Sequence, residues 1–139
     1  MIHADRTTTM KPRVYVETSV LSYLTSWRSR DLIQAAHQEV TIEWWAGRER
    51  FELFVSDAVL MEAGRGDPEA ARRRLAAAEG LTALAATEEA QALASALLRA
   101  AAMPAKAAVD AAHVAIATVH GMNFLLTWNC AHIANATMR

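Results

Sequence analysis

Three acidic side chains stand in apolar stretches of the sequence, where a carboxylate loses hydration and needs compensation. Glu17 ends the run VYVE, Glu62 lies in AVLMEA, and Asp110 lies in AAVDAAHVAIA with almost no other charge around it. An ionised carboxylate is costly to bury unless a partner offsets its charge. A divalent cation is one such partner, and Mg²⁺ favours a few carboxylates together with water. The three acids are therefore candidate ligands of a metal ion.

Each of these acids also has a purely structural interpretation. Glu17 can cap the helix that follows it, and Glu62 can be a solvated helix residue. Asp110 can pair with Lys106, which stands one helical turn earlier. His113 lies on roughly the same side of the helix as Asp110, but such a histidine is more often packed and hydrogen-bonded than a ligand. Spacing alone nominates the three acids and does not establish a metal site.

Strand and helix patterns alternate along the chain, which predicts an α/β fold with a parallel sheet of about four strands flanked by helices. The predicted strands span 13–17, 51–55, 81–84 and 123–127, and the predicted helices span 18–24, 31–48, 58–63, 68–79, 88–102 and 105–120. Thr18 or Ser19 is expected to cap the first helix, and Ser56 with Asp57 the third. Buried stripes are expected on the second and the last helix, formed by Leu32, Ala35, Ala36, Val40, Glu43 and Trp44, and by Val109, Ala112, Ile116 and Val119.

Length and composition favour one cytoplasmic domain. The chain has 139 residues, of which 53% are hydrophobic, and this suffices for a single core. Residues 1–10 are predicted to be a disordered extension and residues 11–139 a single domain. The single cysteine, Cys130, excludes an intrachain disulfide and fits a reducing cytosol. No apolar stretch is long enough to span a membrane, and a net charge of −1 means that nucleic-acid binding would need a local basic patch.

The predicted topology places some polar residues at one edge of the sheet. In an open parallel sheet, functional groups gather at the carboxyl ends of the strands. Glu17 ends the first predicted strand and Asn129 follows the fourth by two residues, so both are expected there. No glycine-rich loop follows the first strand, which disfavours a nucleotide-binding protein. Cys130 and His132 form C-x-H without a second such pair, which disfavours a zinc site.

Four phrases of the sequence together resemble the PIN-domain ribonucleases, with the greatest likeness to VapC-type toxins of type II toxin–antitoxin systems. They are VYVETSVLSYL, VSDAVLMEAGRGDP, AVDAAHVAIA and FLLTWNCAHIANA, and they occur in the family's order from about Arg13 to the C-terminus. The resemblance implies a PIN-like parallel sheet flanked by helices. It also implies a cluster of acids that holds Mg²⁺ or Mn²⁺ and hydrolyses RNA phosphodiesters.

The resemblance assigns roles to individual positions. Glu17, where the family usually has aspartate, and Asp110 match direct metal ligands, and Glu62 matches a glutamate that binds metal or orients the attacking water. Thr18 matches a hydroxyl residue that often lines the metal pocket. Without metal, three clustered carboxylates would repel one another, so the pKa of at least one should be raised. Metal binding should then stabilise the fold at neutral pH.

The chain departs from the family pattern in the loop that commonly supplies a fourth acid. Asn129 and His132 fall in this loop, and neither is acidic. Asn129 would act in catalysis by holding a water or a phosphate through hydrogen bonds without adding charge. The site would then bind one metal, bind metal weakly, or be inactive as a nuclease. The alternative function is therefore a catalytically impaired PIN-like module that binds RNA or a protein partner.

Cationic and aromatic residues suggest where partners would bind. Arg65 follows Glu62 closely and is the preferred RNA-binding residue, while Arg28, Arg30 and the run 72–74 are further candidates. The arginine run is more typical of a solvated helix face, and no aromatic platform for stacking bases stands out. Trp44 and Trp45 are expected to pack one in the core and one at an interface or edge. The resemblance also implies a homodimer and a cognate antitoxin that covers the acidic groove.

Overall fold

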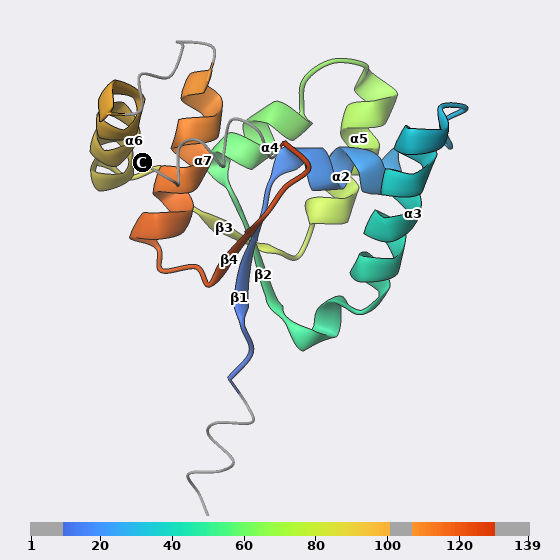
Figure 1. Ribbon diagram of the computed structural model, residues 1–139, viewed down its shortest axis with the longest axis horizontal. Helices are drawn as coiled ribbons and strands as arrows, with labels where there is room; N and C mark the ends of the chain where they lie inside the picture. Colours follow the sequence, from blue (N-terminus) through green and yellow to red (C-terminus); the bar gives the residue numbers. More distant parts are fainter. Residues whose placement is uncertain (1–9, 101–106, 130–139) are drawn as a thin grey trace, which may run out of the picture.

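The computed structural model describes residues 10–100 and 107–129, and a parallel sheet of four strands forms its centre (Figure 1). The strands are β1 (Arg13–Val16), β2 (Glu52–Ser56), β3 (Thr82–Leu84) and β4 (Phe124–Leu126), in the order β3-β2-β1-β4. All neighbouring strands are parallel, and Tyr15 on β1 is paired with Phe54 on β2 and with Leu125 on β4. The predicted α/β fold with about four parallel strands is confirmed.

Six helices flank this sheet within the described residues. They are α2 (Thr18–Thr25), α3 (Leu32–Ala46), α4 (Asp57–Ala63), α5 (Pro68–Ala78), α6 (Glu88–Ala100) and α7 (Ala108–Val119), and a 3-10 turn at Arg48–Arg50 leads into β2. Figure 1 shows α6 and α7 on one side of the sheet, and α2, α3 and α5 on the other. The apolar runs of β1 and β2 are therefore covered on both faces, as a parallel sheet requires. No helix in the described part of the chain is long and apolar enough to cross a membrane.

The first turns of α2 and α4 begin in different ways. The Ser56 hydroxyl caps α4, as predicted, by accepting a hydrogen bond from the amide of Val59. Helix α2 has Glu17 as its N-cap residue rather than Thr18 or Ser19, and no side chain caps it. The two hydroxyls are engaged elsewhere, because both donate to carboxylates. The start of α2 is thus used to hold acids in place.

The predicted buried stripe of α3 is wrong. Leu32 is 86% exposed and Val40 is 52% exposed, whereas the polar residues Gln38 and Thr41 are buried. The Gln38 side chain bonds two backbone groups of the loop that precedes α3. The Thr41 hydroxyl accepts a hydrogen bond from the Trp128 indole beyond β4. These partners come from other parts of the chain, so the apolar periodicity of the helix did not reveal which face turns inward.

The predicted stripe of α7 is correct only in part. Ile116 is buried as expected, but Val109 is 41% exposed. The inward face instead contains Asp110 and His113, which are both buried. Buried polar groups are tolerated when their hydrogen bonds are satisfied, and both side chains have partners. Polar residues therefore determine how α7 faces the sheet.

The two adjacent tryptophans also differ from the expectation that one lies in the core and one at an edge. Trp44 and Trp45 are both half-buried, and both pack against the main hydrophobic core. Trp44 stacks on Phe51 with ring centroids 5.5 Å apart. The Arg48 guanidinium lies over the Trp45 ring, 4.9 Å from its centroid. The end of α3 therefore packs against the segment that leads into β2 through aromatic rings.

The inverted burial on α3 yields a prediction about stability. We expect Leu32→Ala to change the free energy of unfolding by less than about 0.5 kcal/mol, because the side chain is exposed. Gln38→Leu should lower it by about 1–3 kcal/mol, because partly buried backbone groups lose their hydrogen bonds. Urea unfolding of the two variants and the wild type measures both values. A larger loss for Leu32→Ala than for Gln38→Leu would contradict the orientation of α3.

Candidate metal centre

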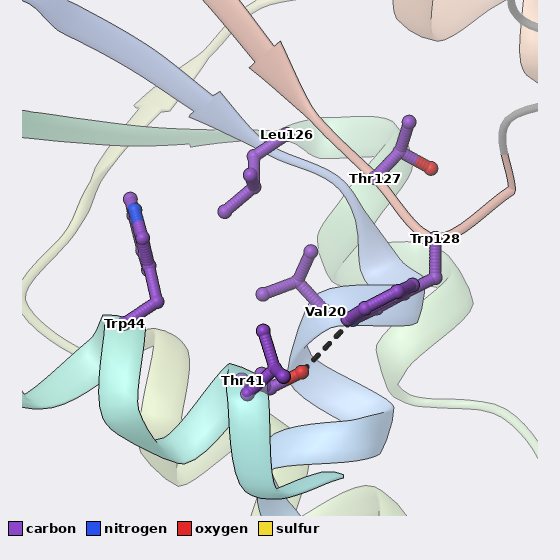
Figure 2. Close-up of a pocket in the computed structure, with 7 residues that line it drawn as sticks. Val20, Thr41, Trp44, Leu126, Thr127 and Trp128 are labelled. Atoms are coloured by element: carbon purple, nitrogen blue, oxygen red, sulfur yellow. Dashed lines mark hydrogen bonds between the residues drawn. The ribbon is translucent and has the colours of Figure 1, made fainter. Parts of the chain in front are cut away.

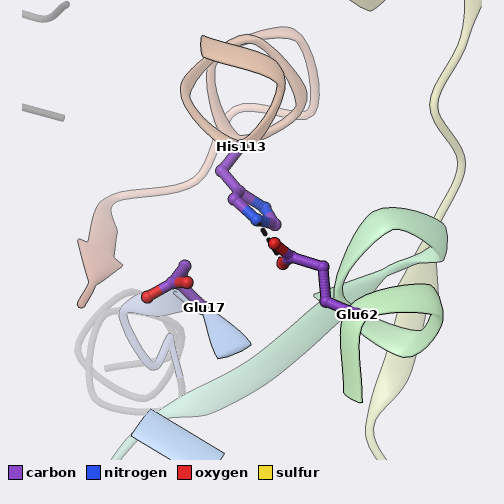
Figure 3. A group of neighbouring side chains, drawn as sticks. All are labelled: Glu17, Glu62 and His113. Carbon is purple, nitrogen blue, oxygen red and sulfur yellow. Dashed lines mark hydrogen bonds and ion pairs between the residues drawn. The ribbon is translucent and has the colours of Figure 1, made fainter. Parts of the chain in front are cut away.

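The acids nominated by the sequence come together near the carboxyl ends of β1 and β2. Glu17 follows β1 directly, and Glu62 lies near the end of α4, the helix that follows β2. Figure 3 shows the Glu62 carboxylate pointing at His113, which projects from α7, and Glu17 near them. One potential ligand atom from each of the three residues lies within 4.8 Å of the other two. The tertiary structure thus brings together two of the three predicted acids and adds a histidine.

Glu17 is 5% exposed and is held by hydroxyl groups. Its Oε1 atom accepts hydrogen bonds from Ser19 Oγ at 2.5 Å and from Thr127 Oγ1 at 2.6 Å. Glu17 occupies the N-cap position of α2, as one interpretation of the sequence had it, but its carboxylate makes no capping hydrogen bond. Neutral hydroxyl donors orient this carboxylate and leave its negative charge in place.

Glu62 accepts two hydrogen bonds at one oxygen. Thr18 Oγ1 lies 2.5 Å and His113 Nε2 lies 2.8 Å from its Oε1 atom. Partial burial by itself raises the pKa of Glu62, but the hydrogen bonds from His113 and Thr18, with the nearby charge of Arg65, lower the pKa below its ordinary value. Glu62 is therefore not the acid of the cluster whose pKa was expected to be raised. Glu62 is a carboxylate at neutral pH and is not a solvated helix residue.

Asp110, in the first turn of α7, is 7% exposed and connects to the same loop as Glu17. It accepts a hydrogen bond from the side-chain Nδ2 of Asn129 at 2.9 Å. The backbone amide of Asn129 donates to Thr127 Oγ1 at 2.8 Å. Thr127 in turn donates to Glu17. The segment after β4 therefore links Asp110 with Glu17. Lys106, the alternative partner of Asp110, lies outside the described residues, as do Cys130 and His132.

Several polar residues of this site were missed as functional candidates. His113 was interpreted as a packed, hydrogen-bonded histidine, and its full burial confirms that, but one of its two hydrogen bonds is with Glu62. The sequence offered one usable signal for Ser19, which stands two residues after Glu17. Thr127 had none, because its partner Glu17 is at the other end of the chain. Long-range contacts of this kind appear only in the folded protein.

The arginines near the site differ in exposure and in the groups that they contact. Arg65 is exposed, and its positive charge helps to lower the pKa of Glu62. In the run 72–74, only Arg72 is a solvated residue, paired with Glu69 at 2.5 Å. Arg73 donates to the Thr25 carbonyl, and Arg74 donates to carbonyls at the end of α4. The predicted solvated face is therefore wrong for Arg73 and Arg74, which join α5 to its neighbours.

The residues present fit a hard divalent cation. Glu17, Glu62 and Asp110 offer carboxylate oxygens, the ligand type that Mg²⁺ and Mn²⁺ prefer. The donors to Glu17 are the neutral hydroxyl groups of Ser19 and Thr127, which fix this carboxylate without cancelling its charge, and Asn129 donates to Asp110. A site of this kind can accept a cation and lose electrostatic repulsion on doing so.

An apolar cavity with a volume of about 220 Å³ lies close to this site but has a different character (Figure 2). It lies between α2, α3 and the end of β4, and it is lined by Val20, Val40, Thr41, Trp44, Leu126, Thr127 and Trp128. None of these side chains is charged, so the cavity lining offers no anionic ligand for a cation. Beside it, Trp128 stacks on His37 with centroids 4.1 Å apart, and Tyr23 packs edge-on against both rings. This aromatic cluster was not predicted, because its three residues are far apart in the sequence.

Comparison with known proteins gives a structural likeness without a sequence match. No protein-family model matches the sequence, and no curated protein matches it. The fold is similar to the crystal structure of VapC20 from Mycobacterium tuberculosis, described as a sarcin–ricin loop cleaving toxin, with a TM-score of 0.67 and 19% sequence identity. The match covers 87% of this chain and 93% of that chain. At this identity the likeness establishes the fold, and it confirms the PIN-like architecture that the sequence motifs implied.

The buried phenol of Tyr15 gives a prediction for alkaline pH. Burial raises the pKa of Tyr15 well above its ordinary value of 10.0, the charges of Glu62 and Glu17 raise it further, and the hydrogen bond with Ser56 only partly opposes this. Because the unfolded chain ionises first, this contribution to stability is complete below pH 10.0 and is lost as the pH rises toward the folded pKa. In Tyr23→Phe, where Tyr15 is the one remaining tyrosine, phenolate absorbance should appear together with loss of circular dichroism. Ionisation near pH 10.0 in a folded protein would contradict this burial.

Proposed function

We propose that the chain is a metal-dependent endoribonuclease of the toxin–antitoxin type. The observation that supports it is the group formed by Glu17, Glu62 and His113 beside the buried Asp110, at the edge of a parallel sheet where such sites form. The fold likeness to a toxin that cleaves the sarcin–ricin loop supports RNA as the substrate class. Glu17, Asp110 and Glu62 are the proposed ligands of Mg²⁺ or Mn²⁺.

Each residue of the site would have its own role in the proposed reaction. A bound divalent cation would supply Lewis acidity toward a phosphate oxygen and a more acidic water. Glu17 and Asp110 would hold the cation, and Glu62 would orient the attacking water or act as a third ligand. Thr18 fixes one oxygen of Glu62. Asn129 keeps its proposed catalytic role as a neutral hydrogen-bonding residue, which it would exercise through Asp110, the acid that it contacts.

The specific observation that favours the alternative is the same Asn129 contact. An amide stands where a fourth carboxylate would add charge, and it is engaged with Asp110. Such a site would hold metal less firmly, and the chain would then be a catalytically impaired module that binds RNA or a protein partner. A measurement of metal binding and a measurement of cleavage on the same samples separate the two functions.

The remaining features of the proposal concern partners and location. We propose a cytoplasmic protein that forms a homodimer and is covered by a cognate antitoxin over the acidic groove. Exposed apolar side chains at the start of α3 support a protein-binding surface there, since Leu32 and Ile33 are 86% and 70% exposed. Trp27, just before this helix, is 76% exposed and lies under the Arg73 guanidinium.

The first test combines thermal unfolding with RNA cleavage. In millimolar Mg²⁺ or Mn²⁺ at about 100 times the dissociation constant, the wild type should gain roughly 2.7 kcal/mol of stability and should cleave a sarcin–ricin loop oligonucleotide or total ribosomal RNA. Asp110→Asn should lose most of both effects, whereas Glu39→Gln, which alters an exposed acid paired with Arg28, should retain them. Stabilisation without cleavage would favour the impaired module. No stabilisation of the wild type by either cation would contradict the metal site.

The second test concerns Arg65 as an RNA-binding residue. Arg65→Ala should weaken RNA binding and reduce the slope of log affinity against log salt by about 1, because one phosphate contact is lost. Arg72→Ala is the matched control, since it removes an exposed arginine that is paired with Glu69. Fluorescence anisotropy with labelled RNA, at several salt concentrations and in Ca²⁺ to prevent cleavage, measures both slopes. Equal slopes for the two variants would remove Arg65 from the proposed contact surface.

A further inference from the structure

A buried chain of hydrogen bonds leads to the Glu62 carboxylate. Ser56 Oγ lies 2.6 Å from Tyr15 Oη, Tyr15 Oη lies 2.7 Å from His113 Nδ1, and His113 Nε2 lies 2.8 Å from Glu62 Oε1. Ser56, Tyr15 and His113 are each 0% exposed. Their side chains come from the end of β2, from β1 and from α7, so the chain joins separate elements. Water cannot compete for the two buried bonds that Tyr15 makes, which makes both of them more effective.

The direction of the protons along this chain follows from the donors available. The backbone amide of Val59 donates to Ser56 Oγ, which uses one lone pair of this oxygen. The hydroxyl proton of Ser56 is therefore free to point at Tyr15. Tyr15 accepts that proton and donates its own to Nδ1 of His113. The imidazole then carries its proton on Nε2 and donates it to Glu62. With the protons arranged in this direction, every polar side-chain atom from Ser56 to His113 has a hydrogen-bond partner.

The opposite direction is unfavourable. If Nδ1 carried the proton of a neutral imidazole, the lone pair of Nε2 would face a carboxylate oxygen 2.8 Å away. Two acceptors at that separation repel each other, and the Ser56 proton would need another acceptor. The geometry therefore selects one tautomer of His113.

We infer that Tyr15 and His113 are positioning residues for Glu62: the Tyr15 hydroxyl holds His113 as the neutral Nε2–H tautomer, and this donor fixes the Glu62 carboxylate. His113 is thus excluded from the metal ligands, although it belongs to the same compact group, because Nε2 has no lone pair to offer. The tautomer assignment stands on the hydrogen-bond geometry alone. Its consequence for metal binding rests on the proposed function.

The row of hydrogen bonds from Ser56 to Glu62 also fixes the position of α4, the helix that carries Glu62. Ser56 caps the start of α4, and Glu62 lies near the end of the same short helix. Tyr15 and His113 connect these two points through β1 and α7, which closes a ring of contacts around α4. Outer groups of this kind orient the ligands of metal sites, and their removal typically lowers metal affinity by about 10- to 100-fold.

The first experiment reads the tautomer in the metal-free protein. Nitrogen NMR of protein labelled with ¹⁵N-histidine should show His113 with a protonated Nε2 and an unprotonated Nδ1, and comparison with His113→Gln assigns the signals. Tyr15→Phe should shift the signal of the unprotonated Nδ1, because this nitrogen loses its hydrogen-bond donor, while Tyr23→Phe should keep the wild-type pattern. A wild-type His113 with Nδ1 protonated, alone or together with Nε2, would overturn the inference. The His113 signals of the wild type can also be assigned through correlations with its own backbone, so this measurement does not depend on whether any variant folds.

The second experiment is a double-mutant cycle on metal affinity, measured by calorimetric titration with Mn²⁺. Tyr15→Phe should weaken binding about 10-fold or more. The glutamine amide of His113→Gln can donate to Glu62 without help from Tyr15, so adding Tyr15→Phe to it should change the affinity little. An equal loss from Tyr15→Phe in both backgrounds would mean that Tyr15 acts only through packing. If the wild type binds no Mn²⁺, the proposed function fails while the tautomer result stands or falls separately.

Discussion

The need to hold like charges close together at one edge of the sheet governs this structure. Glu17 and Asp110 are buried, Glu62 is half-buried, and each has at least one oxygen fixed by a hydrogen bond. The donors to Glu17 are the hydroxyl groups of Ser19 and Thr127, which orient this carboxylate without neutralising it. A cation bound beside Glu17 and Glu62 would offset the repulsion between them. This is the physical basis for regarding the cluster as a metal centre rather than a set of surface acids.

The surrounding elements are arranged to make that cluster rigid. The segment after β4 contacts Glu17 through Thr127 and Asp110 through Asn129, so one short segment sets both acids. Helix α4 is fixed at its start by the Ser56 cap and beyond its end by Arg74, which bonds the carbonyls of Ala63 and Arg65. Arginines that the sequence suggested for RNA binding are thus partly used to brace the scaffold. Arg65 keeps its side chain exposed beside the acids.

The likeness to VapC20 lies in the fold rather than in the sequence. The two chains share an architecture over most of their lengths, yet only 19% of aligned residues are identical. A fold can be shared by proteins with different activities, so the functional argument must rest on the site. Here the site has a glutamate at position 17, an amide at position 129 and a tyrosine–histidine pair behind Glu62. In the proposed metal centre, these features would affect how strongly a cation is held and how Glu62 is oriented.

The sequence by itself determined the order and type of the elements and nominated the acids, because local patterns such as VYVE and AVDAAHVAIA record both periodicity and unusual charge. It also indicated Ser56 as a cap, a contact between residues that are neighbours in the chain. Only the tertiary structure decided that Gln38 and Thr41 face inward on α3 while Leu32 is exposed, and that Asp110 and His113 face the sheet on α7. It alone placed Thr127 on Glu17 and Tyr15 on His113. The physical reason is that buried polar groups lie where their hydrogen-bond partners are, and those partners come from distant parts of the chain that no local pattern can identify.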